Sequence, residues 1–227
     1  AACYASVAAG YFTPASIVAA VGKDFPREYI QLLRDHNVDT TDLRELDGKT
    51  FYWSGEYEEN MNNRRTLDLD LGVFADFKPV LSPQARKTPF VLLGCITPGL
   101  QMDVLLQMES PAFVLADTID HHINTAPDAL KELLKKVDCL SLNDSEARLL
   151  TKEDNLFNAL GKIHEMGPST VIIKKGEHGS MLSHAGEIFL APAYPLAQAV
   201  DPTGAGDTFA GALMGYIARH ATGREDV

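Results

Sequence analysis

Short apolar runs alternate with helical patterns over most of the second half of the sequence. The runs contain four to seven mostly apolar residues each, which predicts buried strands. Between them, apolar residues recur three and four positions apart, as on one face of a helix. This alternation is typical of a doubly wound α/β fold with a mostly parallel sheet. The expected strands are 90–96, 112–117, 139–142 and 170–174, and the expected helices are 100–108, 129–137 and 156–163.

The beginning of the chain predicts a helix, a strand and a second helix. Residues 1–9 are small and apolar and read as a helix already under way. Residues 16–22 form an apolar run that ends in a glycine, which predicts a buried strand. Residues 24–36 carry apolar positions at helical spacing. The first 36 residues therefore belong to the same α/β core as residues 80–227.

The region 37–79 has a different pattern. Residues 50–57 and 66–73 alternate between apolar and polar positions, and the polar stretch 58–65 separates them. Two alternating strands around a polar loop predict an antiparallel ribbon with one face in water. Such a ribbon cannot be part of a buried parallel sheet. On the pattern alone, an ordinary edge hairpin is the simplest interpretation.

Composition narrows the classes of function. The net charge of −11 and the isoelectric point near 5.0 argue against nucleic acid or an anionic membrane as the main partner. The cysteines Cys3, Cys95 and Cys139 lie far apart in apolar surroundings, so we expect buried free thiols in a reducing compartment. No run has the length of a membrane span and no signal peptide precedes the first helix, so we expect a cytoplasmic protein.

The most informative stretch is 201–209, which leads from a loop into a helical pattern. Gly204 and Gly206 lack a Cβ atom, so their backbone N–H groups can approach an anion closely. The helix that follows directs its positive dipole end to the same place. Asp207, in the first turn, could then take a proton from a hydroxyl group that attacks a phosphoryl group. The alternative is a purely structural helix start, with turn-forming glycines and Asp207 as a dipole partner.

The string DPTGAGDTFAG at 201–211 resembles the C-terminal signature of the ribokinase-like (pfkB) carbohydrate kinase family. The resemblance covers most of the chain and is strongest over 143–211. It implies a ribokinase-like fold and ATP-dependent phosphorylation of a hydroxymethyl group on a sugar or nucleoside. Asp207 would be the base, and the amides of Gly204, Ala205 and Gly206 would stabilise the transferred phosphoryl group. The ribbon within 37–79 would be the lid over the substrate, and a homodimer could form through it.

The resemblance also assigns the segment Asn143-Asp144-Ser145-Glu146. Taken alone, Asn143 and Glu146 predict a capping box at the start of a helix. In the family, the Asn of this element lies near the nucleotide phosphates and the Glu acts on Mg²⁺ through water. Mg²⁺ retains several waters in proteins, so a carboxylate one shell further out is chemically reasonable. The resemblance therefore favours ATP and Mg²⁺ as cofactors, with Asn143 and Glu146 near them.

Further candidates come at the ends of other predicted strands. Lys174 and Gly176 fit a hairpin turn, but in relatives this strand end lines the ribose and phosphates of the nucleotide. Asp117 could reach the metal and phosphates or cap the next turn, and the two interpretations are equally supported. Asp201 and Thr203 match positions at which relatives offer oxygen atoms to a monovalent cation such as K⁺.

Substrate contacts are expected from the N-terminal part. Val21-Gly22-Lys23-Asp24 matches a Val-Gly-x-Asp passage of the family, and it nominates Gly22 and Asp24. Tyr4 would stand near the sugar pocket. The family's N-terminal strand with its substrate-binding Asp is missing from this sequence, as are the C-terminal helices that flank the adenine. We therefore expect either a fragment or a protein whose ends are unobserved.

Two other functions stay open at this stage. A catalytically silent relative could bind a sugar or nucleotide as a sensor or scaffold. A Rossmann dehydrogenase is disfavoured because Gly204-Ala205-Gly206 has no glycine at the sixth place, and no P-loop motif is present. His121 and His122 are next to each other without a third metal ligand at a suitable spacing, so we expect no metal there.

Overall fold

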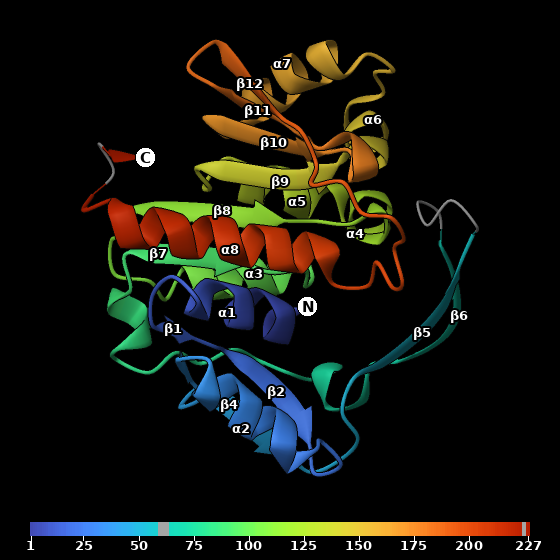
Figure 1. Cartoon of the computed structure of the whole chain (residues 1–227). Coiled ribbons are helices and arrows are strands. Elements are labelled where there is room, and N and C mark those ends of the chain that lie inside the picture. The colour runs from blue at the N-terminus through green and yellow to red at the C-terminus, as the bar shows by residue number, and fades with distance from the viewer. Residues whose placement is uncertain (59–63, 224–225) are drawn as a thin grey trace.

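The computed structural model describes residues 1–58, 64–223 and 226–227 (Figure 1). Its centre is a six-stranded sheet in the order β12-β11-β10-β9-β8-β7. β7 to β10 pair in parallel, and β11 and β12 continue the sheet as an antiparallel hairpin. The strands are β7 (Phe90–Leu93), β8 (Phe113–Asp117), β9 (Cys139–Asn143), β10 (Thr170–Lys174), β11 (Ser180–His184) and β12 (Glu187–Ala191).

Helices cover both faces of this sheet, as the strand and helix alternation predicts. In β8, Val114 and Ala116 face one core cluster, whereas Phe113 and Leu115 face the other. Strands that are buried on both faces read as continuous apolar runs, which is why they stand out in the sequence. The helices on the first face are α3 (Pro98–Leu105), α4 (Asp120–Thr125), α5 (Pro127–Leu134), α6 (Asp144–Thr151) and α7 (Leu156–Met166). The predicted α/β fold with a mostly parallel sheet is confirmed.

The second face is covered by α8 (Ala205–His220), and α1 (Ala2–Gly10) packs against α8 (Figure 1). Glycines allow the two helices to touch backbone to backbone. A Cβ atom at Gly211 would lie 2.1 Å from the carbonyl oxygen of Ala5, and one at Gly215 would lie 2.8 Å from the Cα of Ala9. This close approach fixes the start of α8 relative to α1. The predicted opening helix is confirmed.

The predicted single strand over 16–22 is wrong. The structure divides it into β1 (Ala15–Ser16) and β2 (Ala19–Gly22), which belong to separate two-stranded sheets. Ile17, between them, is buried in a small core with Leu33 and Val38, so an apolar run here marks a core contact rather than one continuous strand. β1 pairs in parallel with β3 (Val38–Asp39), β2 pairs in parallel with β4 (Leu43–Leu46), and α2 (Arg27–Asp35) follows β2.

The predicted antiparallel ribbon is present as β5 (Tyr52–Tyr57) and β6 (Arg64–Asp70), with a β-bulge at Ser54/Gly55. In Figure 1 it extends away from the body of the molecule. Most of the predicted polar loop, residues 59–63, lies outside the described residues. The second strand ends earlier than predicted because Gly72, with a φ of +51°, begins the 3₁₀ turn η1 (Gly72–Phe74). A further turn, η2 (Ala85–Lys87), precedes β7.

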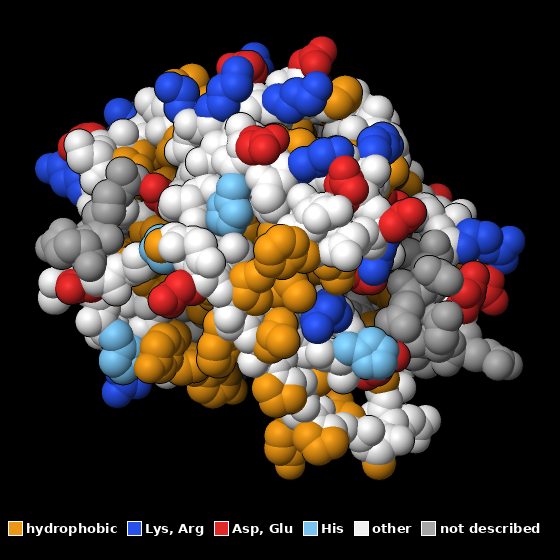
Figure 2. All heavy atoms as spheres, turned by 90° about the horizontal axis from the view of Figure 1, so that it is seen from above, with side chains coloured by type: hydrophobic (Ala, Val, Ile, Leu, Met, Phe, Trp, Pro, Cys, Tyr) orange, Lys and Arg blue, Asp and Glu red, His pale blue; other side chains and the backbone are white. Residues whose placement is uncertain are grey.

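β12 forms the edge of the six-stranded sheet that lies opposite β7, and the sequence analysis did not predict it. Ile188, Phe189 and Leu190 of β12 are all exposed, so the strand lacks the in-and-out pattern of a half-buried strand. Hydrophobic side chains gather on the face seen from above in Figure 2. Within the described part of the chain, no helix is both long and apolar enough to cross a membrane.

Candidate active site

The glycine-lined segment forms the start of α8, as predicted. Gly204 is the N-cap residue and has the left-handed φ of +81°. Before it, Asp201 Oδ1 accepts a hydrogen bond of 2.8 Å from the Thr203 N–H, and the Ala205 N–H donates to the carbonyl oxygen of Pro202 at 3.1 Å. The Ala205 amide is thus already engaged, and the expected anion-binding amides reduce to those of Gly204 and Gly206. The positive end of the helix dipole lies at this turn.

Gly204 cannot be replaced without moving a neighbour. A Cβ atom there would lie 2.6 Å from Cδ2 and 2.7 Å from Cγ of Tyr4, whose ring therefore packs against the turn. Tyr4 is half-exposed and comes from α1. The predicted candidates Tyr4 and Gly204 are therefore in contact.

Asp207 lines a cavity of about 550 Å³ together with Asp117 and Cys95. The Asp207 side chain, in the first turn of α8, is 19% exposed. All residues from 88 to 96 line the cavity. Since side chains of a strand alternate between its two faces, an unbroken run means that the edge of β7, and not one face of it, borders the cavity. Along that edge β7 has no strand partner among the described residues. The cavity therefore extends from the edge of β7 to the first turn of α8.

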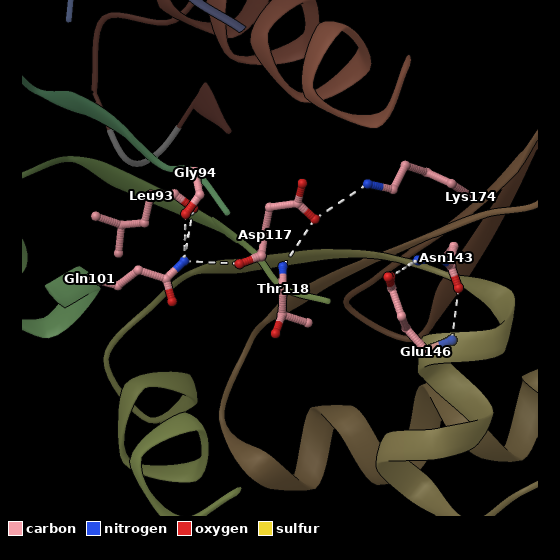
Figure 3. Close-up of polar contacts among 8 residues, drawn as sticks. All are labelled: Leu93, Gly94, Gln101, Asp117, Thr118, Asn143, Glu146 and Lys174. Atoms are coloured by element: carbon pink, nitrogen blue, oxygen red, sulfur yellow. Dashed lines mark hydrogen bonds and ion pairs between the residues drawn. The ribbon is translucent and has the colours of Figure 1, made fainter. Parts of the chain in front are cut away.

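Asp117 and Lys174 form an ion pair beside Asp207. The Lys174 Nζ lies 3.3 Å from Asp117 Oδ1, and the two side chains are 17% and 8% exposed (Figure 3). Burial raises the pKa of the Asp117 carboxyl above its ordinary value, the Lys174 ammonium opposes this rise, and the Asp207 carboxylate adds to it. Asp117 Oδ1 also accepts the Thr118 N–H at 3.0 Å, but no side chain of the described residues caps α4, the helix that follows.

The sequence analysis missed Gln101, which fixes the position of Asp117. Gln101 is buried, and its Nε2 lies 3.1 Å from the Leu93 carbonyl, 2.9 Å from the Gly94 carbonyl and 2.9 Å from the Asp117 carbonyl (Figure 3). One amide thus joins the ends of β7 and β8. A single glutamine in an amphipathic helix carries no signal in sequence, because its burial depends on where α3 crosses the sheet.

Asn143 and Glu146 form the capping box that the sequence predicts. The Glu146 N–H donates to Asn143 Oδ1, and the Asn143 N–H donates to Glu146 Oε2, both at 2.7 Å (Figure 3). The cap turns the Glu146 carboxylate back toward the end of β9. The Glu146 carboxylate also acts on Cys95, as two other carboxylates do. Burial raises the pKa of the Cys95 thiol to about 12, and the carboxylates of Asp117, Asp207 and Glu146 each add to the rise. The three candidate carboxylates therefore lie within electrostatic range of the Cys95 thiol.

The remaining candidates lie in two other places. Gly22 and Asp24 are both hydrogen-bonded to Thr50 at the base of the ribbon. The Gly22 N–H donates to Thr50 Oγ1 at 2.9 Å, and the Thr50 hydroxyl donates to Asp24 Oδ1 at 2.6 Å. Hydrogen bonds from Thr50 hold the pKa of Asp24 below its ordinary value. Neither residue lines the cavity beside Asp207. Gly176, with a φ of +54°, begins the turn between β10 and β11.

The ribbon touches the loop before α8, a contact that the sequence analysis did not predict. The Tyr57 hydroxyl lies 3.2 Å from Thr203 Oγ1, across 146 positions of sequence. Hydrogen bonds from Thr203 also hold the pKa of Asp201 below its ordinary value. Among the described residues, no group of three or more His, Cys, Asp or Glu side chains is placed to hold a metal ion directly.

The match to known proteins places the chain in the class of sugar and nucleoside kinases. It belongs to the pfkB family of carbohydrate kinases, which residues 1–227 match. The family and the kinase class expected from the sequence are confirmed. The roles of single residues stay predictions, because family membership does not test them.

Three relatives show how broad this likeness is. Cytidine kinase from Thermococcus kodakarensis is 28% identical over an alignment of 229 positions, which covers 96% of this chain and 80% of the relative. A provisionally assigned ribokinase II from E. coli, solved with ATP and Mg²⁺, has a TM-score of 0.79 at 20% identity, covering 99% of this chain and 77% of that one. Arabidopsis thaliana ribokinase, solved with ribose and ATP, has a TM-score of 0.74 at 23% identity, covering 99% and 76%.

Proposed function

We propose that this protein transfers the γ-phosphoryl group of ATP to a hydroxymethyl group of a sugar or nucleoside. The observation that carries the proposal is the position of Asp207. It stands in the first turn of a helix that begins on Gly204, and it lines a cavity together with Asp117. A carboxylate next to a helix N-terminus is suited to a reaction in which it takes a proton from a hydroxyl group while the helix dipole stabilises a negatively charged group beside it.

In this reaction, Asp207 takes the proton from the substrate hydroxyl as the hydroxyl oxygen attacks the γ-phosphorus atom of ATP. The bond from that phosphorus to the β–γ bridging oxygen breaks, and ADP leaves. The N–H groups of Gly204 and Gly206 stabilise the negative charge on the transferred phosphoryl oxygens. The Ala205 amide contributes through the shape of the turn, since its hydrogen bond goes to Pro202. Lys174 adds positive charge near Gly206, where a Cβ atom would lie 3.2 Å from its Nζ.

The residues present fit an ATP and Mg²⁺ site. Mg²⁺ binds through one or two carboxylates, substrate phosphates and water, so it needs no cage of protein ligands. Glu146, whose carboxylate the capping box turns back toward the end of β9, would hold the ion through water. When bound, the ion neutralises charge on the phosphates. Asn143 and Gly176, at the ends of β9 and β10, would contact the nucleotide.

Substrate and monovalent cation are proposed to bind near the mouth of the site. Tyr4 would face the sugar beside Gly204, and Gly22 with Asp24 would hold the base of the ribbon, which serves as lid. A cation such as K⁺ would bind oxygen atoms of Asp201 and Thr203. The ribbon also carries exposed apolar side chains, Leu67 and Leu69 among them, which favour pairing of two lids in a homodimer.

The proposal is tested by measuring ATP consumption over a panel of sugars and nucleosides. We expect one group of acceptors to stimulate turnover. Asp207→Asn should lower kcat by about 10³-fold while leaving the melting temperature unchanged, because it removes only the base. The control is Asp128→Asn, which removes an exposed carboxylate from α5. Normal turnover in Asp207→Asn would refute its role as base.

The second candidate is a catalytically silent protein that binds a sugar or nucleotide as a sensor or scaffold. The engaged amide of Ala205 favours it, since a fully open anion hole would have three free N–H groups. It predicts that the wild-type protein binds a nucleotide or sugar in calorimetry but consumes no ATP with any acceptor of the panel.

A further inference from the structure

The Asp117–Lys174 ion pair connects two strands that are not neighbours. β8 ends at Asp117 and β10 ends at Lys174, and β9 lies between them. Adjacent strands are about 4.8 Å apart, so the lysine side chain must cross the end of β9 to reach the carboxylate. It does so, and Figure 3 shows the Lys174 side chain extended toward Asp117. The lysine head group is thus held in one direction.

This pair is costly, because both groups have been largely removed from water. The side chains are 17% and 8% exposed, and burial acts against the charged form of Asp117. Buried ion pairs contribute little net stability compared with apolar residues of the same size. The ion pair therefore indicates a role other than stability for Lys174.

The ammonium group lies where Gly206 leaves room for it. Gly206 is inside α8, and its φ lies outside the left-handed region, so the backbone does not require glycine here. A Cβ atom at Gly206 would lie 3.2 Å from Lys174 Nζ, which is too close for an unstrained contact. The absence of a Cβ atom at Gly206 thus leaves room for the ammonium beside the first turn of α8, where helix N–H groups lack partners within the helix.

We propose that Asp117 is a positioning residue that holds the Lys174 ammonium against the start of α8, and that it is not a ligand of the metal ion. The proposal rests on the proposed function, in which this place receives the transferred phosphoryl group. The Asp117 contacts fit this role: Oδ1 accepts the Thr118 N–H at 3.0 Å and faces Lys174 at 3.3 Å. A divalent cation on the same carboxylate would be repelled by the ammonium so close to it.

The test combines Asp117→Asn, Lys174→Met and the double variant, with two readouts. The first is the dissociation constant of the non-hydrolysable analogue AMP-PNP with Mg²⁺, measured by calorimetry. The second is the Mg²⁺ concentration at half-maximal turnover. The matched controls are Asp128→Asn and Lys131→Met, which remove the same charges from exposed positions on α5. Circular dichroism spectra identify any variant that does not fold.

We expect Lys174→Met to weaken AMP-PNP binding about tenfold, because a charge-assisted contact is lost. Asp117→Asn should weaken it severalfold, and it should add nothing when Lys174 is already Met. The Mg²⁺ requirement should stay within twofold of the wild type throughout. A higher Mg²⁺ requirement in Asp117→Asn that persists in the double variant would overturn the proposal, as would additive losses.

The two proposals fail in different ways. A wild-type protein that binds AMP-PNP but phosphorylates none of the acceptors contradicts the proposed kinase reaction. In that case the AMP-PNP dissociation constants of the variants still measure the coupling between Asp117 and Lys174. If the coupling is absent in an active enzyme, the positioning role is refuted and the kinase reaction stands.

Discussion

The two halves of the candidate site are built in different ways. In the strand-end half (Asp117, Asn143, Glu146 and Lys174), the side chains stand at or just after the ends of buried strands. Hydrogen bonds and an ion pair within this group fix them. In the loop half (201–207), most residues are partly or fully exposed, and contacts from Tyr4 and Tyr57 support the turn. The order of strands in the sheet therefore fixes where the charged side chains lie, whereas the shape of the anion-binding turn depends on a few side-chain contacts.

The largest expected effect concerns the loop half. Gly204→Ala places a Cβ atom at a φ of +81° and 2.6 Å from the Tyr4 ring, so the turn or the ring must move. A displacement of about 1 Å at a reacting centre can lower turnover about 10²-fold. We therefore expect a loss of kcat/KM of that size, measured by steady-state kinetics.

Gly186→Ala is the matched control for this variant. Gly186 has nearly the same φ, +82°, in the turn between β11 and β12, but a Cβ atom there meets open space. It carries only the conformational cost of about 1–2 kcal/mol, which lowers stability and leaves kcat/KM unchanged. If both variants lose activity equally, contact with Tyr4 does not shape the turn.

The next effect tests how firmly the strand-end half is held. Gln101→Leu keeps the side chain similar in size but makes it apolar, and it leaves the carbonyls of Leu93, Gly94 and Asp117 without the amide donor. Since unpaired buried polar groups cost about 1–3 kcal/mol, we expect a loss of at least about 2 kcal/mol in the free energy of unfolding. Urea denaturation measures it.

The control for Gln101→Leu is Gln31→Leu. Gln31 lies on the exposed face of α2, and its amide donates only to Asp35. A surface change of this kind stays within about 0.5 kcal/mol. Equal stability of the two variants would mean that Gln101 does not hold the ends of β7 and β8 together.

A third prediction separates the two roles of Glu146. Glu146→Gln removes the negative charge but retains a side chain that suits a capping box. Because groups that act on a metal through its water ligands typically change affinity 10- to 100-fold, we expect the Mg²⁺ concentration at half-maximal turnover to rise about tenfold. The melting temperature should not change.

Asp144→Asn is the control in the same helix turn. It removes the charge that pairs with Arg148, which is on the surface, and it should leave the Mg²⁺ requirement as it is. An unaltered Mg²⁺ requirement in Glu146→Gln would assign Glu146 to the helix cap alone.

Much of the fold could be predicted because its strongest signals are local. The parallel strands are buried on both faces and read as apolar runs, and the capping box is visible in four residues, 143–146. The division of 16–22 into two strands was not visible, since Ile17 is apolar for its contact with Leu33 and not for strand pairing. β12 was missed because its apolar side chains are exposed and show no alternation.

The site was predictable where one segment contains it and unpredictable where distant segments meet. The turn at Gly204 and the acidic Asp207 follow from consecutive residues. The Asp117–Lys174 pair spans 57 positions, and the Tyr57–Thr203 contact spans 146. Such contacts depend on the order of strands in the sheet, which a single sequence does not specify.

The smallest expected effect asks whether the ribbon contributes to the loop half. Tyr57→Phe removes only the hydroxyl that lies 3.2 Å from Thr203 Oγ1, a partly buried contact worth about 1 kcal/mol. We expect KM to rise two- to fivefold at constant kcat, because the contact supports closure over the substrate rather than the chemical step. Tyr52→Phe, at an exposed position of the same strand, is the control and should change neither constant. A fall in kcat with unchanged KM would place the ribbon in the chemical step and remove the division between the two halves.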